Sequence, residues 1–413
     1  MSARTLDFLR DTFFEYYAKC FEEKCIPSSF ERREFGALLF KGKIMVRHKS
    51  FTSASEVRGF LCSLIPSDVY YSSSYYELPS ASEMSAKGWM GADLTFDIDA
   101  DHIPVHCDKT HDLWTCNSCG STGNGAPERC PKCGGEKLDR NSWPCEICLA
   151  SAKVEATKLL DFLLRDFGFS EEDVRVFFSG HRGYHVQVES EAVRMLDSVA
   201  RREIVDYIFG LGLDLGVYGL GEMSDRRGRA LSAPKLADSG WRGRLAVCID
   251  NLLCSATDED YRKIELKETM IRRIMNNREE ILRRWNDTGL QAVKDLDDVE
   301  SWRKIFSSCI SSASAKVDTV VTADVHRLIR MAGTLHGKTG LKKVEFPISH
   351  IEDFDPFKSA TAFKNGSTHV IVSDAPKFRL GDEVFGPYKN TKVELPTAAA
   401  VLLICKNRAE VLA

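Results

Sequence analysis

The sequence predicts an α+β fold with two insertions, and three observations support this prediction. Short segments with the two-residue alternation of strands are dispersed among segments with helical periodicity. Residues 102–148 are rich in Cys, Gly and Pro and have no apolar period, as expected of a zinc-binding insert. Residues 251–299 contain a charge-rich helical pattern, which predicts a helical insertion on the surface. The core is then formed by segments 1–101, 149–250 and 300–413.

The length and composition are those of a globular protein. The chain has 413 residues, enough for two or three domains or for one domain with large insertions. Its 43% of hydrophobic and 28% of charged residues argue against a disordered or fibrous chain. The formal net charge of −4 excludes a globally basic coat, so any nucleic-acid contact must be a local patch. Long apolar runs and a signal peptide are both missing, so we expect an intracellular protein without membrane contact.

The N-terminal segment predicts a helix followed by strands. Apolar residues recur at helical spacing over residues 5–21. Two strands are expected at 34–40 and 44–51, separated by the turn at 41–43. Residues 94–99 alternate strictly between apolar and polar side chains, so they predict a half-buried strand with one polar face.

The middle of the chain predicts a long helix and then a strand–loop–strand unit. Residues 150–167 place apolar side chains on one helical face, and Gly168 is a suitable residue to end the helix. Strands are expected at 174–178 and 185–189, and the loop between them contains two glycines.

The remaining residues predict further helices and short strands. Helical patterns occupy 190–210 and 266–287, and the polar residues 290–315 predict a linker or short helices. A short helix is expected at 322–331, with Thr322 as its N-cap. Short strands and a final apolar segment at 398–405 complete the chain.

Two carboxylates on the strand at 94–99 form the first candidate site. Asp97 and Asp99 project from one face of that strand, with Cβ atoms roughly 6–7 Å apart. This spacing suits a pair of divalent cations, and oxygen ligands favour Mg²⁺ or Mn²⁺. A solvated strand face would give the same pattern, so the spacing alone leaves both interpretations open.

The loop at 179–185 is a candidate phosphate site. Its two glycines let the backbone approach an anion, and Ser179, Arg182 and His185 add side-chain donors. A flexible hairpin turn that happens to contain basic residues is the alternative interpretation.

A third candidate set lies further along the chain. Asp318 precedes the expected helix at 322–331, Arg330 lies at its end, and His336 lies in the glycine-rich loop beyond it. Each of these residues is common at such a position. Only their combination with the two sites above indicates nucleotide chemistry.

The cysteines predict bound metal. Seven of the 14 fall between residues 107 and 148, and six of these form three C-x-x-C pairs, which in a reducing compartment indicate metal ligands. A zinc ribbon, with four thiolates around a tetrahedral Zn²⁺, is predicted by the spacing of Cys116, Cys119, Cys130 and Cys133. The third pair is Cys145 and Cys148. The seven cysteines outside this region have apolar neighbours and are interpreted as inert core residues.

Four motifs occur in an order that resembles a known family. They are R-R-E-F-G at 32–36, F-D-I-D-A-D-H at 96–102, S-G-x-R-G-x-H at 179–185, and V-D-x-x-V-T-x-x-V-x-R-L-I-R-x-x-G-x-L-H-G at 317–337. Together they resemble the catalytic small subunit of the archaeal and eukaryotic DNA primase, nearest the archaeal type. The resemblance covers roughly residues 30–340. It implies the archaeo-eukaryotic primase fold, with a mixed central sheet flanked by helices.

The resemblance also implies roles for individual residues. The metal-binding carboxylates would be Asp97, Asp99 and Asp318. The nucleotide would be bound by Arg33, Ser179, Arg182, Gly183, His185, Arg330 and His336. Many relatives have a second arginine where this sequence has His181. The family carries a zinc site before its long helix, which here would consist of Cys107, His111, Cys145 and Cys148, with His106 and His102 as alternatives upstream.

The implied activity is template-directed synthesis of short primers on single-stranded DNA, by two-metal nucleotidyl transfer during DNA replication. Implied cofactors are catalytic Mg²⁺ or Mn²⁺ and two structural Zn²⁺. Implied partners are a primase large subunit in a heterodimer, NTPs or dNTPs, and a replicative polymerase or helicase, in the cytoplasm if the chain is archaeal. One alternative is a stand-alone primase-polymerase in repair or end joining. The other is a zinc-dependent DNA-binding subunit without activity, against which the full set of carboxylates and the intact loop argue.

Overall fold

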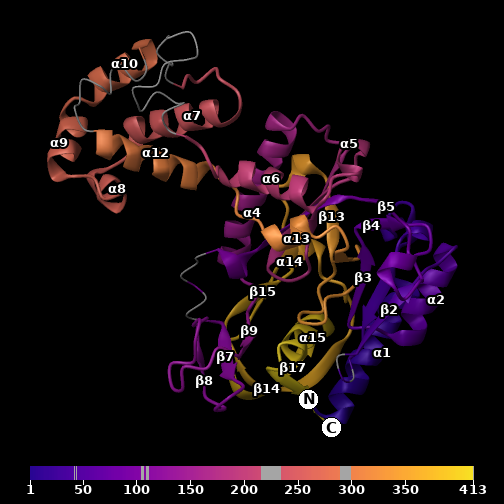
Figure 1. Ribbon diagram of the computed structural model, residues 1–413. Helices are drawn as coiled ribbons and strands as arrows, with labels where there is room; N and C mark the ends of the chain where they lie inside the picture. The colour runs from indigo at the N-terminus through magenta and orange to yellow at the C-terminus, as the bar shows by residue number, and fades with distance from the viewer. Residues whose placement is uncertain are drawn as a thin grey trace. The chain divides into compact units, whose positions relative to one another are not determined.

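The computed structural model describes residues 1–40, 42, 44–103, 107, 111–214, 234–288 and 299–412. The chain forms two compact units. The first contains residues 1–156, 171–201 and 317–413, and the second contains residues 157–170 and 202–316. Figure 1 shows strands throughout the first unit and helices in the second. The predicted α+β class is confirmed. No helix in the described ranges is long and apolar enough to cross a bilayer.

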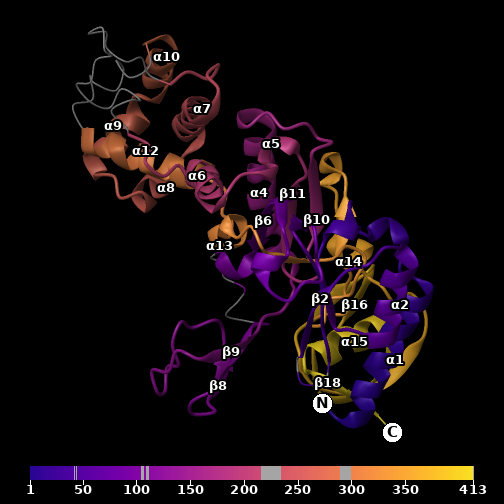
Figure 2. The same ribbon diagram turned by 45° about the vertical axis from the view of Figure 1, so that its right-hand side comes forward.

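The first unit is built around two antiparallel sheets of four strands each. One sheet has the order β13-β10-β11-β6, and its strands β6, β10 and β11 lie side by side in Figure 2. The other has the order β12-β3-β1-β2. The strands of the first sheet are β6 (Leu94–Asp99), β10 (Val174–Phe178), β11 (Gly183–Val188) and β13 (Val344–Phe346). Those of the second are β1 (Phe35–Leu38), β2 (Met45–Lys49), β3 (Asp68–Ser72) and β12 (Leu328–Arg330).

The prediction of one mixed central sheet is wrong. All strand pairs in both sheets are antiparallel. The loop between β10 and β11 is too short for the crossover that a parallel pair needs, which enforces an antiparallel hairpin. The individual strands predicted at 34–40, 44–51, 94–99, 174–178 and 185–189 are confirmed.

Helices and smaller sheets complete the first unit. The predicted N-terminal helix is confirmed, and Ser2 caps it by accepting the Thr5 N–H. The predicted long helix is confirmed as α4, which ends in a π turn at Phe162–Asp166 before Gly168. The helices of this unit are α1 (Ala3–Lys19), α2 (Ala54–Leu64), α5 (Glu191–Arg194), α13 (Thr319–Ala323), α14 (Pro356–Ser359) and α15 (Thr397–Cys405). Most of α4 (Glu146–Asp161) belongs to the first unit, and most of α6 (Ser198–Phe209) belongs to the second. The smaller sheets contain β4 (Ser74–Tyr76) with β5 (Trp89–Ala92), β15 (Phe378–Leu380) with β16 (Glu383–Phe385), and β14 (Ser367–Ala375), β17 (Tyr388–Pro396) and β18 (Ala409–Val411).

The helix predicted at 322–331 is wrong in position. The helix α13 begins three residues earlier, because the carboxylate of Asp318 caps it by accepting the N–H groups of Val320 and Val321. It ends at Ala323, and Leu328–Arg330 then pairs with β3. Arg330 therefore lies on a strand and does not end a helix.

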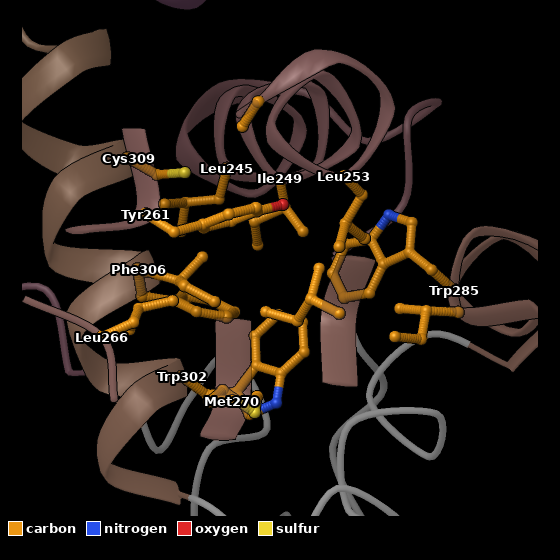
Figure 3. Packing of buried hydrophobic residues seen from close by; sticks show 14 of the residues in the cluster. Leu245, Ile249, Leu253, Tyr261, Leu266, Met270, Trp285, Trp302, Phe306 and Cys309 are labelled. Carbon is orange, nitrogen blue, oxygen red and sulfur yellow. The ribbon is translucent and has the colours of Figure 1, made fainter. Parts of the chain in front are cut away.

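The second unit is a helical bundle with a core of its own. Its helices are α7 (Gly240–Ser255), α8 (Asp258–Lys263), α9 (Glu268–Asn276), α10 (Arg278–Thr288) and α12 (Val299–Ala313). Figure 3 shows the side chains that fill this core, including Leu245, Tyr261, Met270, Trp302 and Phe306. The charge-rich segment 266–287 is thus not only a surface helix, since its apolar residues line the same core.

The linker predicted at 290–315 is wrong for its described part. Residues 299–313 form a continuous helix, because Trp302, Phe306 and Cys309 share the face that packs into the core. Cys309 also forms a disulfide with Cys248 of α7. These two cysteines are therefore not inert core thiols, as their apolar neighbours had indicated.

Candidate active site and metal centres

The carboxylates of Asp97, Asp99 and Asp318 lie near one another where β6 and the start of α13 pack together. Asp97 and Asp99 lie on β6, and the backbone N–H of Asp318 donates to the carbonyl of Asp97 at 2.9 Å. Burial first, and then the charges of Asp99 and Asp318, raise the pKa of Asp97 to about 7. This concentration of negative charge is one that a bound cation would relieve.

A cleft of about 210 Å³ is lined by Asp97 and Asp99, whereas Asp318 is not among its lining residues. It brings together residues from both four-stranded sheets and from two loops. The charged residues of its lining include both acidic and basic side chains: Asp97, Asp99, Asp101, Arg327, Arg330 and Lys338. The other polar residues of the lining are Tyr70, Thr95, Ser179, His181, His185 and His336. An anionic ligand with an associated metal cation matches this distribution of charge.

The loop at 179–183 forms one wall of the cleft and presses closely on β6. The Ser179 Oγ accepts the N–H groups of His181 and Gly183, at 3.3 and 3.2 Å, which fixes the loop. Gly180 has a φ of +87°, a conformation that favours glycine. A Cβ at Gly183 would lie 2.1 Å from the Ile98 carbonyl oxygen, so only glycine fits there.

His185 lies directly beside the carboxylates. It pairs with Asp97 across the β11–β6 ladder, and its Nε2 lies 3.5 Å from the Asp97 Oδ1. Burial, followed by the positive charges of Lys343 and Arg330, holds the pKa of His185 well below its usual value. The imidazole is therefore neutral at neutral pH and is available as a hydrogen-bonding group.

Arg330 is held in the cleft by a buried carboxylate. Its guanidinium donates to Asp68 and, at 3.4 Å, to the Tyr70 hydroxyl. Asp68 also accepts the N–H of Gly337 at 3.0 Å, and so joins Arg330 to the loop that carries His336. Burial and the neighbouring charge of Arg330 hold the pKa of His336 well below its usual value.

The two loops that flank the cleft are bonded to each other. The Thr339 hydroxyl donates to the Gly180 carbonyl at 2.6 Å, and the ring centroids of His181 and His336 lie 5.1 Å apart. The segments at 179–185 and 336–341 therefore form one continuous wall.

Three of the predicted nucleotide contacts are not among the residues that line the cleft: Arg33, Arg182 and Gly183. The guanidinium of Arg33 is buried against Asp93, at 2.7 Å, and the Tyr75 hydroxyl. That of Arg182 is buried against Asp112, at 2.6 Å. Each guanidinium is paired with a buried carboxylate, and direct contact of either arginine with a nucleotide stays a prediction.

The sequence interpretation missed several lining residues. Arg327 lies inside the quoted motif at 317–337, and Lys338 follows it directly, so both had a local signal. Thr95 shares the polar face of the strand at 94–99 with Asp97 and Asp99, so it had a local signal as well. Tyr70 had none, because strand pairing alone brings it to the cleft.

The first metal centre, the ribbon site, is built from two matching turns. The Gly120 N–H donates to the Cys116 carbonyl and the Gly134 N–H to the Cys130 carbonyl, at 2.9 and 2.8 Å. The two turns present Cys116, Cys119, Cys130 and Cys133, whose sulfur atoms all lie within 4.8 Å of one another. A small sheet supports them, formed by β7 (Leu113–Cys116), β8 (Thr122–Asn124) and β9 (Leu138–Asn141). Four thiolates at this spacing fit a structural Zn²⁺.

The second metal site lies at the start of α4. Its ligand atoms, which also lie within 4.8 Å of one another, belong to Cys107, His111, Cys145 and Cys148. The Nδ1 of His111 bonds to Asp112 at 2.6 Å and leaves Nε2 facing the Cys148 sulfur at 3.7 Å. A carboxylate behind a histidine in this way is typical of zinc ligands. Of the two alternatives upstream, both His106 and the side chain of His102 lie outside the described part of the structure.

Comparison with known proteins identifies the family. The sequence pattern described as DNA primase small subunit matches residues 137–348. The chain is 32% identical to the DNA primase small subunit PriS of Nitrosopumilus maritimus over the full length of both chains. It is 35% identical to the PriS of Methanococcoides burtonii, over 99% of both chains. It is 34% identical to the PriS of Archaeoglobus fulgidus, over 97% of both chains.

The chain belongs to the DNA primase small subunit family. The resemblance to the archaeal type is thereby confirmed. Membership of the DNA primase small subunit family implies the use of a divalent metal. The two clusters of cysteine and histidine agree with zinc binding in addition.

Proposed function

We propose that this chain is the catalytic subunit of an archaeal-type DNA primase, which makes short primers on single-stranded DNA during replication. As a family member it is a nucleotidyltransferase that joins nucleotides on a template. The observation that carries the proposal is a single cleft lined both by Asp97 and Asp99 and by the basic residues Arg327, Arg330 and Lys338.

The metal-binding residues of this proposal are Asp97, Asp99 and Asp318. Their oxygen atoms are the ligands that Mg²⁺ and Mn²⁺ prefer. The pKa of Asp97 is raised by burial and also by the charges of Asp99 and Asp318, a repulsion that a bound cation would relieve. When bound, such ions make the primer 3′-hydroxyl more nucleophilic and stabilise the leaving pyrophosphate.

The triphosphate would lie against the wall formed by the two loops. Arg330 and Lys338 supply positive charge, and His185 and His336 supply hydrogen bonds. The carboxylate of Asp68 accepts a hydrogen bond from Arg330 and so orients its guanidinium before the nucleotide binds. Placement and charge compensation supply most of the catalytic benefit in phosphoryl transfer.

The partners follow from the family. A small subunit pairs with a large subunit and binds DNA and nucleotides, and we propose the same for this chain, with a replicative polymerase or helicase nearby. Replication places the protein inside the cell, in the cytoplasm of an archaeon.

The test is primer synthesis on single-stranded DNA with labelled NTPs or dNTPs, with and without the large subunit. Asp97→Asn, Asp99→Asn and Asp318→Asn each remove one negative charge at nearly constant volume, so we expect nucleotide addition to be abolished while folding survives. The matched control is Asp374→Asn, which makes the same substitution at an exposed carboxylate on β14 and should leave nucleotide addition unchanged. Near-normal synthesis by any of the first three variants at ordinary Mg²⁺ would rule out the metal assignment.

A further inference from the structure

Arg182 belongs to the proposed nucleotide loop, but its side chain leaves the cleft. The guanidinium is 1% exposed, and one of its nitrogens donates to Asp112 at 2.6 Å and lies 3.0 Å from the carboxylate of Asp101, a residue that lines the cleft. Its other terminal nitrogen lies 3.3 Å from the sulfur of Cys148. The side chain thus contacts a ligand of the second metal site and the carboxylate beside it.

The partner of Arg182 also orients that metal site. One carboxylate oxygen of Asp112 binds the guanidinium, and the other bonds to the His111 Nδ1 at 2.6 Å and accepts the Trp143 N–H at 2.8 Å. Asp112 therefore fixes the ring of His111, a metal-ligating residue, and the position of Arg182 at the same time.

The backbone of Arg182 is bonded to the end of the catalytic strand. Its carbonyl accepts the N–H of Ala100 at 3.1 Å, and the next residue, Gly183, pairs with Asp99 across the β11–β6 ladder. One residue therefore joins the second metal site, through its side chain, to the carboxylate strand, through its backbone.

The charges explain why the contact depends on the metal. A zinc ion with three thiolates carries a net negative charge, and Asp112 adds another, so the buried guanidinium has strong counter-charges when zinc is bound. Without zinc, Cys148 and His111 lose the ion that holds them in place, so the contacts that orient the guanidinium are no longer fixed.

We propose that Arg182 is a positioning residue that couples occupation of the second metal site to nucleotide binding in the cleft. It acts by holding the loop at 179–185 and the end of β6 in register, and it does not touch the triphosphate. This proposal rests on the proposed function, because it assigns the nucleotide to that cleft.

Coupling between two sites is reciprocal, and this gives a test that does not depend on activity. Zinc release from the intact protein is followed with a chelating dye, and the two release phases are assigned with Cys116→Ser and Cys148→Ser. A non-hydrolysable nucleoside triphosphate with Mg²⁺ and primer–template should slow release from the second metal site about fivefold or more, and leave the ribbon site unchanged.

Arg182→Ala should speed release from the second metal site by about tenfold or more and abolish the nucleotide effect, with a raised KM for the nucleotide. Arg182→Lys keeps the positive charge but cannot make both contacts, so its rate of zinc release should lie between those of the wild type and Arg182→Ala. This variant replaces Arg182→Ala in the test if the alanine variant does not fold. Arg129→Ala is the matched control, since this exposed arginine pairs with Glu136 beside the ribbon site.

Three results would overturn the coupling. The first is an Arg182→Ala protein that loses nucleotide affinity at an unchanged rate of zinc release, because Arg182 would then contact the nucleotide itself. The second is faster zinc release with unchanged nucleotide affinity, since Arg182 would then only pin the metal site. The third is a wild-type protein that binds the analogue without any change in zinc release. Failure of the wild type to bind the analogue at all would instead refute the proposed function.

Discussion

Replacing Gly183 with alanine should separate the two strands that carry the active site. The added Cβ would lie 2.1 Å from the Ile98 carbonyl oxygen and 3.0 Å from the Asp99 Cα, and real Cβ contacts under 3.0 Å are essentially never seen. The strands β11 and β6 must therefore move apart by about 1 Å at the carboxylates. A displacement of about 1 Å costs roughly 10²-fold in rate, and overpacking of this kind costs about 1–3 kcal/mol of stability.

The assay is addition of a single nucleotide to a labelled primer–template, combined with urea unfolding of the same preparations. For Gly183→Ala we expect kcat/KM to fall by about 10²-fold and the free energy of unfolding to fall by about 1–3 kcal/mol. Gly59→Ala is the matched control, because Gly59 lies exposed within α2 with no other atom within 4 Å of the added Cβ. It should keep full activity and gain about 0.5–1 kcal/mol, since alanine favours a helix over glycine. Wild-type kcat/KM in Gly183→Ala would refute the reasoning that this close approach sets the position of Asp99.

Three other perturbations test separate parts of the structure. Arg330→Ala should weaken nucleotide affinity about ten- to hundredfold in a binding titration, since a hydrogen bond to a charged group contributes about 1.5–3 kcal/mol. Arg175→Ala is the control: it removes an ion pair with Glu345 and should leave nucleotide affinity unchanged. Equal losses of affinity in the two variants would contradict the role of Arg330. Metal analysis should find two zinc ions per chain, and a single zinc in the intact protein would contradict the two-site arrangement. Cys116→Ser should lose one zinc and leave basal nucleotide addition measurable. Cys148→Ser should lose the other zinc and destabilise the whole chain more, because Cys148 lies in the first turn of α4 and contacts Arg182. Burial, with the nearby charges of Lys338 and Arg182, lowers the pKa of Lys406 to about 7. An unfolded lysine keeps its proton up to about pH 10, so the unfolded chain binds more protons than the folded one between these values. The free energy of unfolding should therefore rise by about 1–3 kcal/mol from pH 7 to pH 9. That rise should be flatter in Lys406→Met and unchanged in Lys389→Met, an exposed lysine on β17, and an equal slope in all three proteins would exclude Lys406 as its source.

Local spacing in the sequence determined much of the candidate site. The strict alternation at 94–99 puts Asp97 and Asp99 on one face whatever the rest of the fold does, because successive side chains of a strand point to opposite sides. The C-x-x-C spacing likewise predicts the ribbon site, since each pair forms its turn from adjacent residues. The helix at 5–21 and the hairpin around the loop at 179–183 follow from the same short-range patterns.

Only the tertiary structure decided how distant segments meet. Arg330 lies on a strand because pairing with β3 outweighs the helical pattern of its neighbours, and residues 299–313 form a helix because their apolar face fills a core that no local pattern reveals. The direction of the Arg182 side chain was equally hidden from the sequence. A guanidinium in a glycine-rich loop can face a phosphate or a carboxylate, and the choice depends on Asp112, which the fold of the zinc-binding insert brings to it. Burial of a charge requires a partner, and the partner's position is a property of the whole fold rather than of the segment that carries the charge.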